Sequence, residues 1–141
     1  MPDASTTIPG TMDTDPTYTL EEARRLLPQV RATLLQLAVE RQRADASHAE
    51  LHRRLRDGEN GSDPDDQSAL EANATEQRAQ VRALLDHLES LGVVIRDLDA
   101  GLVDIPTLRD GEPAWLCWRL ADPELGYWHT TREGFSTRRP L

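Results

Sequence analysis

Apolar and small residues recur at spacings of three and four along two stretches of the chain, residues 20–55 and residues 70–91. Such a stripe places one face of a helix against a partner helix. The pattern therefore predicts one helix over residues 19–57 and a second over residues 64–91, with a tip loop over residues 58–63 between them.

Residues at the expected helix ends have the chemistry of helix caps. Thr19 and Glu22 have the spacing of a capping box, in which each side chain accepts a hydrogen bond from a free N–H group of the first turn. Asp63 followed by Pro64 suits the start of the second helix, and Gly92 suits its C-terminal cap. The caps therefore support two separate helices.

The two apolar stripes match each other when the chain folds back on itself. One register pairs four layers, Val30–Leu91, Leu37–Leu84, Ala44–Gln77 and Leu51–Leu70. A register that holds over so many turns favours a long, antiparallel, coiled-coil-like hairpin of two helices.

After Gly92 the apolar period changes from that of a helix to that of short strands. The strands are expected at Val93–Ile95, Leu102–Ile105, Ala114–Leu120 and Leu125–His129. They form a small antiparallel β meander, which is too small to be stable alone and is expected to pack on the leucine-rich base of the hairpin. The predicted fold class is α+β, with residues 93–141 as its β-rich segment.

The domain organisation is expected to be simple. Residues 1–17 are rich in Thr, Asp and Pro and contain little to bury, which is typical of a disordered leader. The length of the remainder predicts a single domain over residues 18–141.

The charge of the chain excludes several classes of partner. The net charge is −9, and residues 1–92 carry 10 arginines against 17 acidic residues. A duplex nucleic acid or an anionic membrane surface attracts basic proteins, so neither is an expected partner. The chain has no apolar run long enough for a signal peptide or a membrane span, and its single cysteine excludes an internal disulfide. The cytoplasm is the expected compartment.

Candidate chemistry lies in the β-rich segment, where five of the six aromatic residues fall within residues 115–135. Strand alternation places Cys117 on one face of its strand and His129 on one face of the next. A turn between these strands is expected to bring Cys117 opposite His129, within about 5 Å, with Asp104 or Glu124 completing the group. Trp118, Trp128 and Arg138 are the candidates for contact with a bound cofactor.

Thiolate and imidazole together suit zinc or iron, so Cys117, His129, Asp104 and Glu124 form a candidate metal or haem site. Two alternatives remain open. Cys117 and the tryptophans belong to a buried core, or Cys117 and His129 act as a thiol-based or acid–base catalytic pair. The spacing matches no paired CxxC motif, and the sequence does not decide whether the protein is an enzyme.

Two further histidines, His48 and His52, lie four residues apart near the expected hairpin tip. They have no third ligand of the HExxH kind, so a solvated helix face explains them better than a metal site.

Several blocks of sequence, in order along the chain, resemble one protein family. These blocks are YTLEEARRLLPQV, LGVVIRDLDAGLVDIP, AWLCWRL, YWH and GFSTRRPL. Together they resemble the DUF2203 family of uncharacterised bacterial proteins over roughly residues 18–141. The resemblance implies a small stand-alone bacterial protein with this hairpin and C-terminal block, and implies no activity. The family has a Gly-Glu pair before its Trp-His strand, whereas this chain has Asp122-Pro123-Glu124, so the glycine is missing.

Three functions from different classes fit these observations. The first is a binding or interaction module that forms a homo-oligomer or docks a protein partner through the hairpin, because Arg41, Ala44 and His48 leave its distal face underfilled. The second is a metal- or haem-binding protein with its site at Cys117 and His129. The third is an RNA-binding helical arm, which rests on analogy and is disfavoured by the acidic charge.

Overall fold

The computed structural model describes residues 16–57 and 64–141 of the chain. The expected tip loop and residues 1–15 of the expected leader lie outside these described residues. The chain divides into two compact units, Met1–Val30 with Leu88–Leu141 and Arg31–His87. We call the described parts of these the sheet unit and the helical unit, and describe each by itself. The single domain over residues 18–141 stays a prediction.

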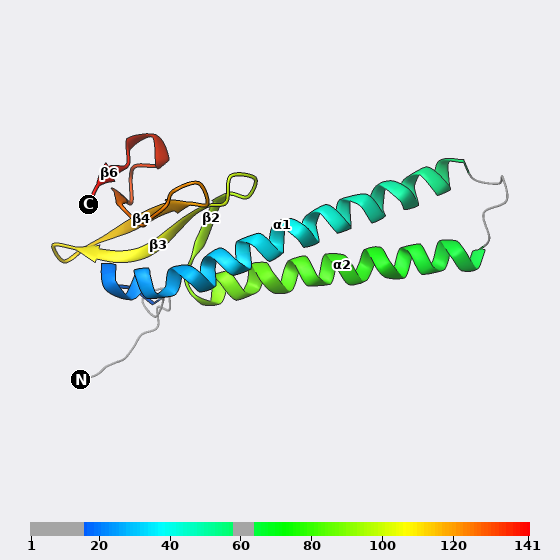
Figure 1. The fold of residues 1–141 in the computed structure, drawn as a ribbon, viewed down its shortest axis with the longest axis horizontal. Coiled ribbons are helices and arrows are strands. Elements are labelled where there is room, and N and C mark those ends of the chain that lie inside the picture. The colour runs from blue at the N-terminus through cyan, green and yellow to red at the C-terminus, as the bar shows by residue number, and fades with distance from the viewer. Residues whose placement is uncertain (1–15, 58–63) are drawn as a thin grey trace. The chain divides into compact units, whose positions relative to one another are not determined.

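Two long helices, α1 (Leu20–Arg56) and α2 (Pro64–Ser90), lie where the apolar stripes predicted them (Figure 1). The predicted capping box at the start of α1 is present. The Thr19 N–H donates to Glu22 Oε1 at 2.9 Å, and the Glu22 N–H donates to Thr19 Oγ1 at 3.1 Å. Gly92 follows α2 with a φ of +78°, a left-handed conformation that glycine adopts without strain.

The helical unit contains an antiparallel pair of helix segments with a narrow buried seam (Figure 1). Thr33, Leu34 and Leu37 of α1 and Ala74 of α2 are buried in it. Gln77, also in the seam, has a buried side-chain oxygen without a hydrogen-bond partner. The predicted helical hairpin is therefore confirmed, and its distal seam contains few large apolar side chains.

The sheet unit contains a five-stranded antiparallel sheet whose strands follow each other in chain order. The strands are β2 (Val94–Asp97), β3 (Leu102–Arg109), β4 (Glu112–Arg119), β5 (Tyr127–Thr130) and β6 (Arg139–Pro140), with the short 3-10 helix η2 (Phe135–Thr137) before β6. This confirms the predicted meander. β6 was not expected, because two residues ending in proline carry no apolar alternation. Asp110 and Gly111, both with positive φ, form the tight turn between β3 and β4.

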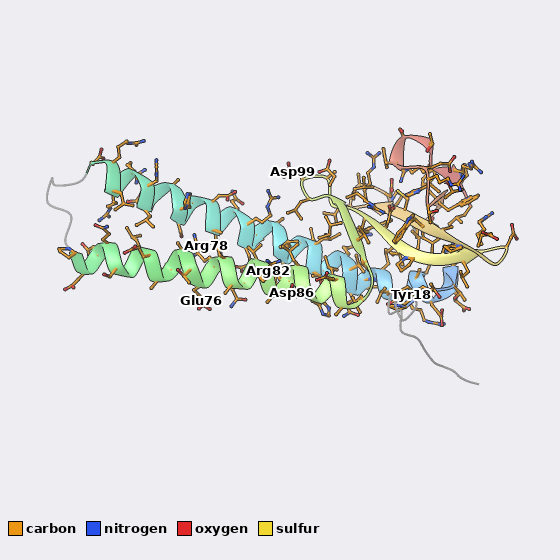
Figure 2. The ribbon with its side chains drawn as sticks, turned by 180° about the vertical axis from the view of Figure 1, so that it is seen from behind. Tyr18, Glu76, Arg78, Arg82, Asp86 and Asp99 are labelled. Carbon is orange, nitrogen blue, oxygen red and sulfur yellow. The ribbon has the colours of Figure 1, made fainter. Side chains whose placement is uncertain are left out.

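One face of the sheet forms the core of the sheet unit. Its buried side chains are Val103, Ile105, Ala114, Leu116 and Trp118, and the helix residues buried in the same unit are Ala23, Leu27, Val30 and Leu88. Tyr18, labelled at the start of α1 in Figure 2, ties the helix to β3. Its N–H donates to the Pro106 carbonyl at 2.9 Å, and its own carbonyl accepts from Thr107 Oγ1 at 2.6 Å. The base of the hairpin therefore packs on the meander, as predicted.

The opposite face of the sheet is covered by the chain that follows β5. In Figure 1 this C-terminal segment lies on the side of the sheet away from α1. Side chains on this face alternate along each strand with those of the core. The candidate site lies here.

Candidate metal centre

Three potential metal ligands converge on the covered face of the sheet, each from a different strand. Asp104 of β3, Cys117 of β4 and His129 of β5 have one ligand atom each within 4.8 Å of the other two. Each residue is no more than 2 % exposed. Within residues 16–57 and 64–141, this is the one group of at least three His, Cys, Asp or Glu side chains that lie close enough together to hold an ion.

The strand register differs from the one that the sequence predicted. Cys117 pairs with Asp104 on β3 and with Tyr127 on β5, whereas His129 pairs with Trp115. The expectation that Cys117 lies directly opposite His129 was therefore wrong by two residues. A shift of two residues keeps a side chain on the same face, so the His129 ring still reaches the group diagonally across the sheet.

Both ring nitrogens of His129 face hydrogen-bond acceptors. Nδ1 lies 2.8 Å from the Thr130 carbonyl oxygen, and Nε2 lies 3.0 Å from both carboxylate oxygens of Asp104. A carbonyl oxygen only accepts hydrogen bonds, so Nδ1 carries the hydrogen and donates. In a neutral ring with its hydrogen on Nδ1, Nε2 is a hydrogen-bond acceptor. An ionised Asp104 carboxylate is also an acceptor, so the two groups cannot form a hydrogen bond with each other. A proton or a metal ion between Nε2 and Asp104 would satisfy both groups.

Arg96 of β2 is a site residue that the sequence analysis missed. Its Nε donates to Asp104 Oδ2 at 2.8 Å, and its guanidinium carbon lies 5.1 Å from the centre of the Trp115 ring. Val94 pairs with Asp104, and strand alternation places Arg96, two residues further on, on the same face of the sheet. This alternation was the signal in the sequence that could have identified Arg96. The signal was weak, because an irregularity between Ile95 and Asp97 interrupts the alternation at Arg96.

The environment of Cys117 keeps its thiol protonated. Burial, and then the charge of the Asp104 carboxylate, raises the pKa of the Cys117 thiol to about 11, although Arg138 acts in the opposite direction. Reactive cysteines have lowered pKa values, so this environment disfavours Cys117 as a nucleophile. A bound metal ion is the species that converts such a thiol into a thiolate at neutral pH.

A bidentate ion pair between Arg138 and Asp122 holds in place the chain after β5, which covers the candidate site. Two nitrogens of Arg138 donate to the Asp122 carboxylate, at 2.8 and 3.3 Å, and the guanidinium lies over the Tyr127 and Phe135 rings. Burial alone would raise the pKa of Asp122, but hydrogen bonds from Arg138 and from the Arg119 backbone outweigh it and lower the pKa. The pair joins the turn after β4 to the residue before β6.

The structure brings Arg138 next to Cys117 but does not bring the remaining candidates, Glu124, Trp118 and Trp128, to the three potential ligands. Glu124 is exposed and lies outside the group. Trp118 is buried on the core face, and its Nε1–H donates to the Asp122 carbonyl at 3.2 Å. Trp128 is half-buried between Arg109 and Arg139, whose guanidinium carbons lie 4.3 and 5.2 Å from its ring centre.

A cavity of about 340 Å³ adjoins the three ligands. Besides Asp104, Cys117 and His129, its walls are formed by Arg96, Leu102, Thr131, Glu133, Gly134 and Phe135. An ion held by the three ligands would therefore be in contact with a space that admits a small molecule.

Comparison with known proteins identifies a family without a described activity. The model of DUF2203, described as an uncharacterized conserved protein, matches residues 16–141. No curated protein and no solved structure matches the chain. Neither of the described helices is long and apolar enough to cross a membrane.

Proposed function

The chain belongs to the DUF2203 family, and we propose that it is a metal-binding protein in which Asp104, Cys117 and His129 hold one zinc or iron ion. The observation that carries this proposal is the position of His129 between two acceptors, the Thr130 carbonyl and the Asp104 carboxylate. Histidines that bind metals commonly donate their other ring N–H to a carbonyl or carboxylate, which orients the free nitrogen toward the ion.

The distances support a single tetrahedral ion. Zinc ligands lie about 2.0–2.3 Å from the metal, so two of them in a tetrahedron lie roughly 3.3–3.8 Å apart. His129 Nε2 and the Asp104 oxygens are already closer than this, at 3.0 Å, and all the ligand atoms lie within 4.8 Å of one another, so separations that change by about 1 Å suffice for coordination. Three protein ligands leave a fourth position open, as in catalytic zinc sites.

A single ion fits these ligands better than a haem does. A haem requires a flat slot for its ring, with ligands along the axis through the iron. Here the three donor atoms converge on one point, and all three side chains are buried. We therefore propose an ion rather than a haem.

Titration of the metal-free protein with Co²⁺ and Zn²⁺ tests the proposal. The expected result is one ion per chain, with a thiolate-to-cobalt absorption band that appears as Co²⁺ is added. Uptake should tighten as the pH rises, because the Cys117 proton has to leave when the metal binds. Uptake far below one ion per chain, without a thiolate band, would rule the metal centre out.

A second candidate function, self-association through the hairpin, is supported by an uncharged stripe on the outer face of α1. The stripe consists of Leu35, Val39, Gln42, Ala46 and Ala49, all exposed. Leu35 is 51 % exposed and Val39 is 47 % exposed. These five residues follow the alternating spacing of four and three that a helix presents to a partner helix.

The stripe is self-complementary in size. If two copies pair antiparallel about Gln42, Leu35 of each copy lies against Ala49 of the other, and Val39 lies against Ala46. Large side chains then meet small ones, and each contact occurs twice, as a twofold interface requires. We propose that a second copy of the chain covers this stripe.

Sedimentation of a stripe variant tests the homodimer. Replacing both Leu35 and Val39 with glutamate should convert a dimer into a monomer, because four carboxylates would be placed in the small apolar interface. Leu55→Glu is the control, since Leu55 is equally exposed at 51 % and lies outside the stripe. A wild-type chain that sediments as a monomer up to high concentration would contradict the proposal.

The proposed metal centre suits the cytoplasm of a bacterium, where reducing conditions keep Cys117 free to bind a metal.

The RNA-binding arm stays a prediction. The helical unit has a cavity of about 520 Å³ whose charged walls are Arg41, Asp45, Arg78 and Arg82, the last two labelled on α2 in Figure 2. Its arginines do not distinguish RNA from other anions.

A further inference from the structure

Arg96 presents a preorganised cationic group to the cavity beside the metal ligands. Its Nε is engaged by Asp104, and its guanidinium is stacked on Trp115, which orients the plane of the group. The side chain is 44 % exposed and lines the cavity. The terminal nitrogens of a guanidinium match the two oxygens of a carboxylate.

The charge of the loaded site favours a ligand with one negative charge. A divalent ion is neutralised by the Asp104 carboxylate and the Cys117 thiolate, so Arg96 leaves a net charge of about +1 at the cavity. Glu133, the other carboxylate in the cavity wall, is paired with Arg139 at 2.8 Å. Glu133 therefore does not offset the charge of Arg96.

The walls of the cavity limit the body of such a ligand. Leu102 and Phe135 supply apolar surface, and the volume of about 340 Å³ is at the lower end of the range for small-molecule sites. We infer that the cavity binds a small monocarboxylate with an apolar body, one carboxylate oxygen on the open metal position and the other on Arg96. This inference rests on the proposed metal centre.

Binding of benzoate to the Co²⁺-loaded protein tests the inference. Benzoate should change the visible spectrum of the bound Co²⁺, acetate should bind more weakly because it lacks the apolar body, and metal-free protein should not bind benzoate. Arg96→Gln, studied at saturating Co²⁺, should weaken benzoate binding by about tenfold or more, because a charge-assisted hydrogen bond is lost.

Arg109→Gln is the matched control for Arg96→Gln. It removes the same charge, but Arg109 is stacked on Trp128 and does not line the cavity. Benzoate affinity in this variant should remain within about twofold of the wild type, since surface charges are screened.

The possible failures of the experiment are distinguishable. Full Co²⁺ uptake without a spectral response to benzoate would overturn the carboxylate site and leave the metal centre standing. Absence of Co²⁺ uptake would overturn both. Equal weakening by Arg96→Gln and Arg109→Gln would overturn the role of Arg96, and tighter binding of inorganic phosphate than of benzoate would overturn the ligand class.

Discussion

Replacing His129 with alanine is expected to abolish stoichiometric metal binding. The change removes the one imidazole of the group and leaves Asp104 and Cys117 as the remaining ligands. Changes to groups that only orient a ligand already weaken metal binding by about 10- to 100-fold, so loss of a ligand should weaken it by about a hundredfold or more. Metal content after dialysis and Co²⁺ titration measure this effect.

Cys117→Ser gives an independent measure of the same site. Serine has nearly the size of cysteine but forms no thiolate, so the thiolate-to-cobalt band should vanish and affinity should fall by a similar factor. Circular dichroism checks that both variants retain the wild-type fold.

The control for adventitious binding is the double change His48→Ala with His52→Ala. These two histidines are stacked on α1 with their ring centres 6.4 Å apart, which is the arrangement that could bind an ion nonspecifically. Their removal should leave one ion per chain. The assignment is wrong if metal is lost from this variant and retained by His129→Ala.

Trp118→Ala is expected to cause the largest loss of stability in the sheet unit. The Trp118 side chain is fully buried, and its indole N–H donates to the Asp122 carbonyl in the turn after β4. Truncation of a buried tryptophan to alanine lowers the free energy of unfolding by about 3–5 kcal/mol. Urea unfolding followed by circular dichroism measures the difference.

Trp128→Ala is the matched control, because Trp128 is only half-buried and lies between two arginines. Its replacement should lower the free energy of unfolding by about 1–2 kcal/mol, from partial burial and two weak cation–π contacts. If Trp118→Ala yields no folded protein, Trp118→Phe should be intermediate, since it keeps most of the volume and loses the N–H donor. Equal effects of the two alanine changes would contradict the assignment of Trp118 to the core.

The secondary structure could be predicted because its signals are local. The Thr19–Glu22 capping box and the apolar stripes each depend on residues within a few positions of one another. The strands were predicted with displaced ends, since β3 extends to Arg109 beyond the last residue of the apolar run. Main-chain pairing with β4 continues through the exposed Leu108 and Arg109, where the alternation of buried and exposed side chains has ended.

Part of the candidate site could be predicted because the face on which a side chain lies and its chemical type are both properties of a single strand. Alternation placed Cys117 and His129 each on a defined face of its own strand, the expected turn brought those faces together, and their side-chain types indicated a metal. Which carboxylate joins them is not a local property. Asp104 lies in the strand that pairs with β4, whereas Glu124 lies in a turn and points to solvent.

The sequence by itself determined the two helices, the meander and the alternation of side chains along each strand, because these follow from periodicity and capping within single elements. Only the tertiary structure decided the pairing of Cys117 with Tyr127, the reach of His129 to Asp104 and the position of Arg96 on that carboxylate. The first two depend on the registers among β3, β4 and β5, whereas the position of Arg96 depends on the pairing of β2 with β3. Registers and contacts between distant residues form only once the strands are in place, so no local pattern predicts them.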